Sequence, residues 1–470
     1  MEQGISGLDW RRWAQDRWLW IALGLGLVLR VAPLLLWPQS ECIRDECIYR
    51  AIANAIIEGE GLTTSSKGWL PAPGYPFLLA WTKQIFGTMQ SVKVMQVILS
   101  MISVVMLYAI GHLVSGRRTA RISALLLALN PTIAWFTNTL WIETIYIFFL
   151  LAAGLGILIA QRTSRWMPAL WSGVMLGFAV LFRGIATYLP PLYLLAVCWP
   201  EQGNPLDLND WVSSGRKRWR SLAAFGVGLV LTVSPWSIYG SQTYGGFMVS
   251  DATVGHVLFL GNNDFPPLTF DYGNGMLTQP LFARYLKTGR RPCKRSEPPV
   301  QSSKCEVQQA LRWIQTHPGR FIGRIPMRLA QIFNPNSFLT RHVRWGYLPG
   351  LPWFLKEALC VLIVTWTTAL YVGGTLAAWG RARGPWAYVA VGTTIYTLAI
   401  TAIMYGMTRF RLPLEALWTV YLALFLANPR ATFDALRDSP ARLTGALITI
   451  PPVLALMLWY LPTGFPMFWR

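Results

Sequence analysis

Long apolar runs are the feature that most constrains how this chain of 470 residues can fold. A helix needs about 20 consecutive apolar residues to cross the hydrocarbon core of a bilayer. Eleven such stretches can be assigned, of which the third, fifth and tenth are short: residues 18–37, 91–115, 119–134, 140–160, 167–183, 186–200, 221–239, 353–378, 386–405, 413–427 and 443–461. Only 13% of the residues are charged, whereas soluble domains carry about 25%. The sequence therefore predicts an all-α polytopic membrane protein with about eleven transmembrane helices.

The distribution of lysine and arginine predicts the orientation of these helices. Six connectors on one side hold 17 of the 41 basic residues: "DWRRWAQDR", "GRRTAR", "QRTSR", "GRKRWR", "WGRARG" and "NPRATFDALRDSPAR". The connector "PTIAWFTNT" on the other side holds none. Because short basic loops stay in the cytoplasm, we predict a multi-pass protein of the inner (plasma) membrane with a cytoplasmic N-terminus.

Two long segments, 38–90 and 240–352, then lie outside the cytoplasm. The second holds 13 basic residues, but loops longer than about 60 residues are translocated regardless of charge. Its run "GRRPCKRSEPPVQSSKC" fits either a solvated loop near anionic lipid or a site for phosphate or an anionic glycan. We predict an N-terminal transmembrane module at 1–239, a small mixed α/β outer segment at 240–352, and C-terminal transmembrane helices at 353–470.

Four of the six cysteines fall in these outer segments, on the oxidising side of the membrane: Cys42, Cys47, Cys293 and Cys305. A disulfide between the last two is compatible with that location, although the sequence does not decide the pairing. The cysteines and the four histidines show no zinc-ligand spacing. We therefore predict no metal site in this chain.

The first outer segment begins with "SECIRDECIYRAIANAIIEGEGL", where Asp45 and Glu46 are adjacent. Apolar residues recur at helical spacing from Ile43 to Ile57, which predicts an amphipathic helix lying in the membrane interface. Asp45 falls in its first turn, where the helix dipole favours a carboxylate. These residues alone leave two readings open, an acid that stabilises the helix end and an acid with a chemical role.

The order of several motifs resembles that of the GT-C glycosyltransferases, in particular the dolichyl-phosphate-mannose protein mannosyltransferases and the bacterial lipid A aminoarabinose transferases. The motifs are a "DExxY" sequence, a G-x-G-L turn, "PAPGYPFLLA", "NPTIAWFTNTLWIETIYIFFLLAA", "GVMLGFAVLFRG", "SPWSIYGSQTYGGFMVSDATVGHVLFLGNN" and "YGMTRFRLPLEAL". Together they extend over most of residues 18–428. The resemblance implies a GT-C-like bundle with interfacial helices in the first outer loop.

The chain also departs from this pattern. Some relatives have a lysine directly before the second apolar stretch, but here "PAPGYP" has none and the nearest cation is Lys67. The segment "PWSIYGS" lacks the Arg–Asn pair that relatives often carry. There is no "WWD" sequence and no DxD triad, which argues against en bloc glycan transfer and against a nucleotide-sugar donor.

The resemblance implies transfer of a sugar from a polyprenyl-phosphate donor to a hydroxyl group, with inversion at the anomeric carbon. A carboxylate must take the acceptor proton, and this role carries over to Asp45. Glu46 is the second acid of the pair, and its expected role is either to orient the substrate or to hold the surrounding structure in place. Glu143 is the second candidate base, although it also fits a cap of the fourth span. A phosphate leaving group needs no general acid, and no cofactor is expected. A donor with a single phosphate does not require a divalent metal, although the acid pair leaves that alternative open.

The candidate substrate-binding residues all lie on the predicted outer side: Tyr49, Lys67, Arg183, Asn262, Asn263, Arg409 and Arg411. Arg183 fits either a phosphate contact or an anchor in the headgroups. Arg409 and Arg411 are charged residues in a short outer loop, against the charge bias, and arginine geometry suits phosphate. Asn262 and Asn263 follow an expected strand and fit turn residues as well as sugar contacts.

Two other functions stay open at this point. A transporter or flippase for a lipid-linked glycan would explain the many spans, although no internal repeat supports it. A non-catalytic assembly partner would explain the missing lysine before "PAPGYP". The expected partners are a polyprenyl-phosphate-linked sugar, a lipid, protein or polysaccharide acceptor, and membrane lipid, with no nucleic acid.

Overall fold

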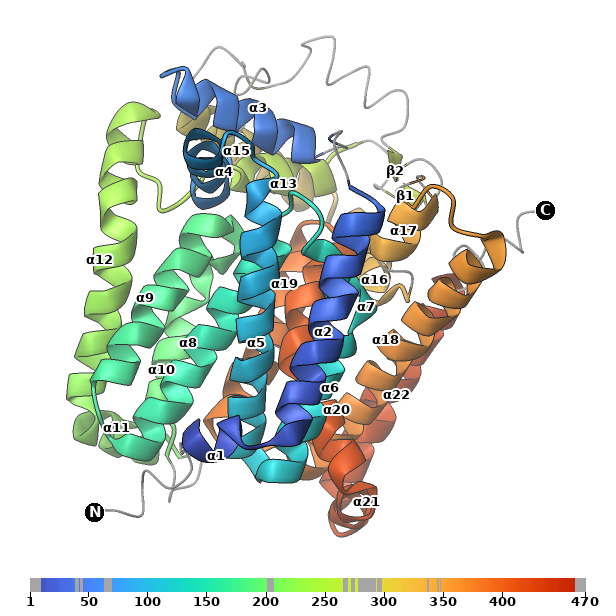
Figure 1. The fold of residues 1–470 in the computed structure, drawn as a ribbon. Coiled ribbons are helices and arrows are strands. Elements are labelled where there is room, and N and C mark those ends of the chain that lie inside the picture. The colour runs from blue at the N-terminus through green and yellow to red at the C-terminus, as the bar shows by residue number, and fades with distance from the viewer. Residues whose placement is uncertain are drawn as a thin grey trace.

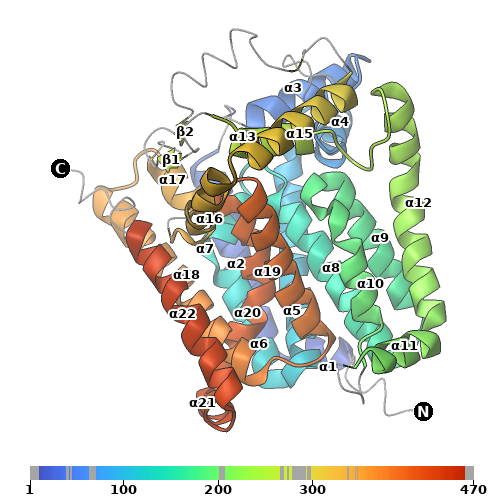
Figure 2. The same ribbon diagram turned by 180° about the vertical axis from the view of Figure 1, so that it is seen from behind.

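The computed structural model describes residues 10–38, 42, 45–62, 70–200, 207–264, 269–271, 275–277, 293, 298–335, 338–344, 346 and 348–460. Lys67 lies outside the described residues. The described chain is a bundle of long helices, with shorter helices gathered across one of its ends (Figure 1). Figure 2 shows the same arrangement from behind.

Eight helices of the described residues are long and apolar enough to cross a membrane. They are α2 (Arg17–Leu36), α5 (Ser91–Ser115), α8 (Glu143–Thr163), α12 (Trp219–Thr243), α18 (Trp353–Arg381), α19 (Pro385–Ile403), α20 (Leu412–Ala427) with the preceding 3-10 turn η3 (Thr408–Arg411), and α22 (Pro440–Tyr460). A further apolar helix, α9 (Met167–Phe182), is shorter. The prediction of an all-α polytopic membrane protein is confirmed.

The two remaining predicted spans are helical but interrupted. The first consists of α6 (Arg117–Leu129) and α7 (Pro131–Phe136), and the second of the 3-10 turn η2 (Gly184–Tyr188) and α10 (Pro190–Val197). At 1.5 Å per residue, a 13-residue helix such as α6 extends about 20 Å, which is less than the hydrocarbon core. Prolines start the second helix of each pair because they have no N–H to continue the preceding ladder.

The six basic connectors lie together at one end of the bundle, where α1 (Trp10–Ala14), α11 (Leu208–Lys217) and α21 (Pro429–Arg437) are found (Figures 1 and 2). The opposite end carries the short helices α3 (Asp45–Ile57), α4 (Gly74–Phe86), α13 (Val254–Gly261), α15 (Pro299–Thr316), α16 (Pro318–Phe333) and α17 (Phe338–Arg344). The chain therefore passes between the two ends in the order that the charge pattern requires. The assignment of the basic end to the cytoplasm stays a prediction.

The described residues of the outer segment 240–352 are mostly helical. Its two strands, β1 (Thr269–Asp271) and β2 (Gly275–Leu277), form an antiparallel pair in which Phe270 lies opposite Met276. The prediction of a strand before Asn262 is wrong, because that stretch forms helix α13. Apolar residues of α13 pack against Ala310 of α15, and this packing outweighs the strand preference of its valines.

Two close contacts show how the bundle is held together. In the first, α9 and α12 touch backbone to backbone: a Cβ added to Gly228 would lie 2.4 Å from the carbonyl oxygen of Leu170. Small residues at helix crossings permit such contacts in membrane proteins. In the second, the buried Arg30 of α2 donates from Nε to Ser100 Oγ at 2.8 Å and from Nη1 to the Ala128 carbonyl at 2.9 Å. Its side chain thus links α2, α5 and α6 inside the bundle.

Candidate active site

Asp45 is the first residue of α3, at the end of the bundle opposite the basic connectors. The helix forms because its apolar face, which includes Ile52 and Ala53, is buried. The Asp45 carboxylate accepts a hydrogen bond at Oδ2 from Arg409 Nη1 at 2.6 Å. About a third of the Asp45 side chain remains exposed, at 36%. The structure therefore pairs two residues that are 364 positions apart in the sequence.

Glu143 and Arg183 form a second ion pair nearby. Glu143 begins α8 and is fully buried, and its Oε1 lies 3.4 Å from Arg183 Nη1. Neither carboxylate oxygen of Glu143 accepts a hydrogen bond from the described residues. The Arg183 guanidinium also lies over the rings of Tyr146 and Phe410, at 5.2 and 5.5 Å from their centroids. Both Glu143 oxygens thus keep acceptor capacity for a ligand.

Both ion pairs line one cavity of about 470 Å³. Its walls come from α3, the start of α8, the end of α9, η2, α13, the end of α19 and η3. Much of the surface is apolar or aromatic, with Phe182, Ile185, Tyr188, Tyr396 and Ile400 among the lining residues. A cavity of this size with few, grouped charges is typical of a small-molecule site.

Tyr49 lines the same cavity, one helical turn after Asp45. Its ring packs edge-to-face on Tyr75 at a centroid distance of 5.2 Å. Burial, followed by the charge of Asp45, raises the pKa of Tyr49 well above its ordinary value. Its phenol, which is protonated at neutral pH as in any tyrosine, can donate a hydrogen bond into the cavity.

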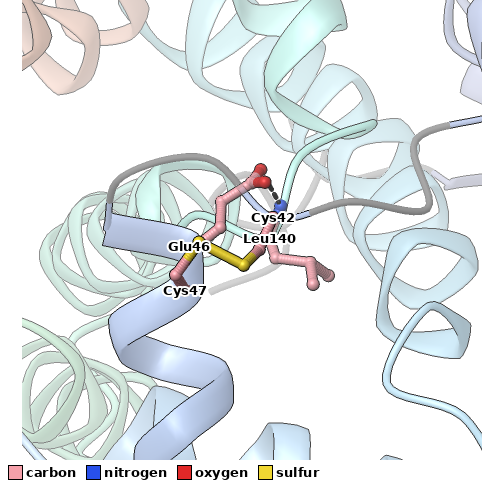
Figure 3. Close-up of a disulfide and its surroundings, with 4 residues drawn as sticks. All are labelled: Cys42, Glu46, Cys47 and Leu140. Carbon is pink, nitrogen blue, oxygen red and sulfur yellow. Dashed lines mark hydrogen bonds between the residues drawn. A yellow bond between two sulfur atoms is a disulfide. The ribbon is translucent and has the colours of Figure 1, made fainter.

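Glu46 points elsewhere and does not line the cavity. It is buried, and its Oε1 accepts a hydrogen bond from the Leu140 N–H at 2.9 Å (Figure 3). A disulfide joins Cys42 to Cys47, so that Asp45 and Glu46 lie inside a small covalent ring. The disulfide and the Glu46 hydrogen bond together fix the start of α3 against the turn that leads into Glu143. The second disulfide, Cys293–Cys305, is also present.

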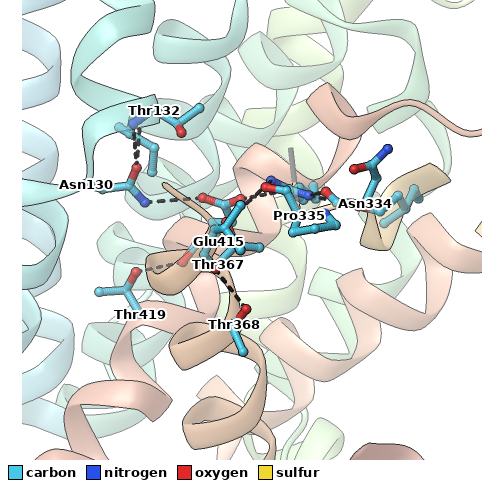
Figure 4. A network of polar contacts seen from close by, with 12 residues as sticks. Asn130, Thr132, Asn334, Pro335, Thr367, Thr368, Glu415 and Thr419 are labelled. Atoms are coloured by element: carbon cyan, nitrogen blue, oxygen red, sulfur yellow. Dashed lines mark hydrogen bonds and ion pairs between the residues drawn. The ribbon is translucent and has the colours of Figure 1, made fainter. Parts of the chain in front are cut away.

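Arg411 separates from Arg409 in space. It is fully buried and lies outside the cavity lining, where its Nε donates to Glu415 Oε1 at 2.8 Å. It also donates to the carbonyl oxygens of Asn334 and Pro335. The buried polar network around Glu415 connects Asn130 at the junction of α6 and α7 with α18, α20 and the segment after α16 (Figure 4). These contacts link Arg411 to several helices, away from the cavity that Arg409 lines.

Asn262 and Asn263 likewise lie outside the cavity lining. The Asn263 amide donates to the Phe259 carbonyl oxygen at 2.8 Å, within the last turn of α13. Asn262 donates to the carbonyl oxygens of Leu258 and Ile403, each at 2.9 Å. The amides of both residues therefore bind helix ends, as turn-forming residues do.

Sequence reasoning did not assign Asp251 and His256, although both line the cavity. Asp251 stands in a turn between two helices, where a single aspartate before Ala–Thr resembles an ordinary turn residue. His256 Nδ1 lies 3.6 Å from Glu306 Oε1 of α15, a contact between distant segments that no local motif signals. The described residues contain no group of three or more His, Cys, Asp or Glu side chains that could hold a metal.

Comparison with known proteins gives a family match and several similar solved structures. Residues 71–239 match the model of the dolichyl-phosphate-mannose-protein mannosyltransferase family. No curated protein matches the chain. Among solved structures, ArnT from Cupriavidus metallidurans bound to undecaprenyl phosphate is 13% identical, with a TM-score of 0.39 over 87% of this chain and 77% of that chain.

The oligosaccharyltransferase AglB from Archaeoglobus fulgidus, in complex with an inhibitory peptide and a dolichol-phosphate, is 15% identical with a TM-score of 0.46, over 97% of this chain and 56% of that chain. Its apo form is 14% identical with a TM-score of 0.48, over 96% and 56%. This chain thus spans about half the length of the oligosaccharyltransferase structures it matches. The match of residues 71–239 to the dolichyl-phosphate-mannose-protein mannosyltransferases confirms the resemblance to GT-C glycosyltransferases that the sequence predicts.

Proposed function

We propose that this chain is a GT-C membrane glycosyltransferase that moves a hexose or pentose from a polyprenyl-phosphate donor to a hydroxyl group of an envelope acceptor. The observation that carries the proposal is the cavity in which Asp45 pairs with Arg409 and Glu143 pairs with Arg183. The family match to mannosyltransferases over residues 71–239 supports the same class of reaction. The acceptor is a lipid, a protein or a polysaccharide.

In the proposed reaction, Asp45 takes the proton of the acceptor hydroxyl as its oxygen attacks the anomeric carbon. The bond between that carbon and the phosphate oxygen breaks, and its electron pair leaves with the lipid phosphate. Direct displacement inverts the anomeric centre. A positioned carboxylate acting as base contributes about 100-fold or more to such a step. Glu143 is the second candidate base because its oxygens keep acceptor capacity.

The arginines supply the positive charge that the departing phosphate needs. Arg409 binds Asp45 in the structure, and a donor phosphate would compete for the same guanidinium. Arrival of the donor would then release Asp45 to act as a base. Arg183, next to Glu143, can bind another phosphate oxygen. With this charge in place the displacement requires neither a cofactor nor a divalent metal, and we expect transfer to persist after chelation.

The cavity lies at the end of the bundle away from the basic connectors. If those connectors face the cytoplasm, the reaction occurs on the outer face of the inner membrane. The apolar walls formed by η2 and α19 suit a donor that arrives within the bilayer. In this proposal the module 1–239 carries the base, and the segment 240–352 closes the cavity from the outside.

The test uses purified protein in liposomes with radiolabelled polyprenyl-phosphate sugars and crude envelope acceptors. Wild type is compared with Asp45→Asn and with Glu58→Gln, an exposed acid after α3 that lies outside the cavity lining. We expect transfer by wild type and by Glu58→Gln, and a loss of about 100-fold or more in Asp45→Asn. Thermal unfolding confirms that each variant is folded.

Equal transfer by wild type and Asp45→Asn would remove Asp45 from the chemistry and move the search to Glu143. Absence of transfer by wild type with every donor, together with movement of a labelled lipid-linked sugar across the bilayer, would contradict the proposal in favour of transport.

A further inference from the structure

Asp251 is a third carboxylate in the wall of the cavity, and the proposed reaction leaves it without a role. It lies in the segment between α12 and α13. Asp45 and Glu143 each pair with an arginine, whereas no basic side chain of the described residues pairs with Asp251. The Asp251 side chain is half-buried, and a carboxylate partly withdrawn from water without a countercharge destabilises a fold. Its presence in a ligand-sized cavity therefore calls for a ligand that donates hydrogen bonds.

One oxygen of Asp251 is already committed. Its Oδ1 accepts hydrogen bonds from the N–H and from the Oγ1 hydroxyl of Thr253, each at 3.1 Å. Oδ2 has no hydrogen bond from the described residues and retains its acceptor capacity. Burial raises the pKa of Asp251, as expected for a carboxyl group that lacks a countercharge.

The position of Oδ2 depends on a glycine. A Cβ added to Gly184 would lie 1.5 Å from Asp251 Oδ2, so the carboxylate packs directly on the glycine α-carbon. Gly184 directly follows Arg183, one of the two proposed phosphate-binding residues. The segment of Asp251 is fixed a second time, because the Ala252 N–H donates to the Leu70 carbonyl oxygen at 3.0 Å. The Asp251 carboxylate is thus held in the part of the cavity wall that contains Arg183 and Gly184.

We propose that Asp251 is a sugar-binding residue whose Oδ2 accepts a hydrogen bond from a hydroxyl group of the sugar on the lipid-phosphate donor. This inference rests on the proposed function and identifies the residue that distinguishes a sugar-bearing lipid from a bare one. Sugar hydroxyls are neutral donors, and they suit a carboxylate that no cation neutralises. Ile185 and Tyr188, which also line the cavity, offer apolar surface for the carbon face of the sugar.

The donor sugar fits this place better than the acceptor does. Asp45 must face the acceptor hydroxyl, whereas the donor phosphate lies at the arginines. Asp251 packs against the residue that follows Arg183, so it lies near the group attached to the phosphate. The apolar lining on this side, including Ile185, also suits a ligand that enters from lipid.

A structural role for Asp251 can be separated from a binding role by the choice of variant. Asn at this position keeps an oxygen to accept from both donors of Thr253, because Asp and Asn form the same local turn. It replaces the free Oδ2 acceptor with an NH₂ donor. Asp251→Asn therefore preserves the turn while removing the proposed sugar contact. Gly184→Ala acts independently, by displacing the carboxylate.

The experiment measures donor binding rather than turnover. Full-length protein in nanodiscs is titrated with undecaprenyl phosphate and with undecaprenyl-phosphate-linked mannose, glucose, galactose and arabinose, and bound lipid is quantified by native mass spectrometry. The readout is the ratio between the affinity for the best-bound sugar lipid and that for the bare lipid. Asp264→Asn serves as a control, since Asp264 is an exposed acid of the same outer segment that does not line the cavity.

We expect wild type and Asp264→Asn to prefer one sugar lipid over the bare lipid. In Asp251→Asn and Gly184→Ala the ratio of the two affinities should be roughly tenfold smaller. Affinity for the bare lipid should stay unchanged in Asp251→Asn and Asp264→Asn. A full preference retained by Asp251→Asn would overturn the inference and leave the proposed function standing. Wild type that binds sugar-bearing and bare lipids equally would also overturn it. Wild type that binds no polyprenyl phosphate at all would contradict both the proposed function and the inference.

Discussion

At the scale of single residues, the two arginines of "TRFRLP" show how neighbours in the sequence come to do different work. Arg409 extends into the cavity toward Asp45, and its guanidinium lies over the Trp141 ring at 5.1 Å. Arg411 turns into the bundle and meets Glu415. The 3-10 turn η3 causes this divergence, because residues two apart on a tight helix point in different directions.

We expect Arg409→Gln and Arg411→Gln to fail in different assays. Arg409→Gln should fold, and its rate of sugar transfer should fall about 100-fold, because a cationic side chain that binds the leaving phosphate is removed. Arg411→Gln should lower the melting temperature, because it leaves the buried Glu415 charge without its partner, at a cost of about 3 kcal/mol or more. Transfer assays and thermal unfolding on both variants make the comparison. Loss of stability in both, or loss of transfer alone in both, would contradict the division of roles.

His342 of α17 gives a prediction about pH. Burial, followed by the charge of Arg341, lowers its pKa from 6.5 to about 3, and its Nδ1 accepts a hydrogen bond from Trp135 Nε1 at 2.8 Å. Below pH 6.5 the unfolded chain gains a proton at this position while the folded protein does not. Stability should therefore fall as pH decreases below 6.5, by about 1.4 kcal/mol per unit from this histidine.

Unfolding curves in detergent at pH 7 and pH 5 test this expectation. His342→Gln keeps a hydrogen-bond acceptor but cannot titrate in this range, so the difference between the two pH values should be smaller than in wild type. An identical pH dependence in wild type and variant would show that other groups cause it.

At the scale of elements, the apolar periodicity of the sequence was sufficient to find every long span. It could not find the break between α6 and α7, because Asn130 and Pro131 occur inside one apolar run and only the cap geometry ends the helix there. The helix α13 was mistaken for a strand because valine favours both a strand and a buried apolar helix. Asp251 was missed because its cavity is formed by segments far apart in the sequence.

Two glycines of α12 allow a matched test of helix packing. A Cβ on Gly228 would meet the Leu170 carbonyl oxygen at 2.4 Å, whereas a Cβ on Gly226 would meet nothing within 4 Å. Gly226→Ala should be neutral or stabilise the protein by about 0.5 kcal/mol through helix propensity. Gly228→Ala should destabilise it because α9 and α12 must separate. Thermal unfolding of both variants measures the difference, and equal melting temperatures would argue against the close α9–α12 contact.

At the scale of the whole molecule, the bundle has one basic end and one end that carries the candidate site. The sequence predicts this polarity in two steps. The alternation of spans decides which loops share an end, and the charge of the loops decides which end is basic. It could not predict which acids and arginines meet there. Asp45 and Arg409 come from opposite halves of the chain, and only the folded bundle brings them together.

The orientation can be tested by labelling single introduced cysteines in intact cells with a membrane-impermeant maleimide. Glu58→Cys, an exposed position at the cavity end, should react without permeabilisation. Ser213→Cys, an exposed position of α11 at the basic end, should react only after permeabilisation. Cys198 also lies at the basic end and is partly exposed, so its Ser variant is the background. The reverse pattern would place the cavity in the cytoplasm.

The Cys42–Cys47 disulfide makes the geometry around Asp45 depend on where the first outer loop matures. If the cavity end faces an oxidising compartment, the ring that encloses Asp45 closes only after the first outer loop has crossed the membrane. A newly made copy, or a copy inserted upside down, keeps both thiols and leaves the start of α3 without its covalent brace. Disulfide formation would then act as a checkpoint during biogenesis, because it braces Asp45 only in copies whose cavity faces the oxidising side.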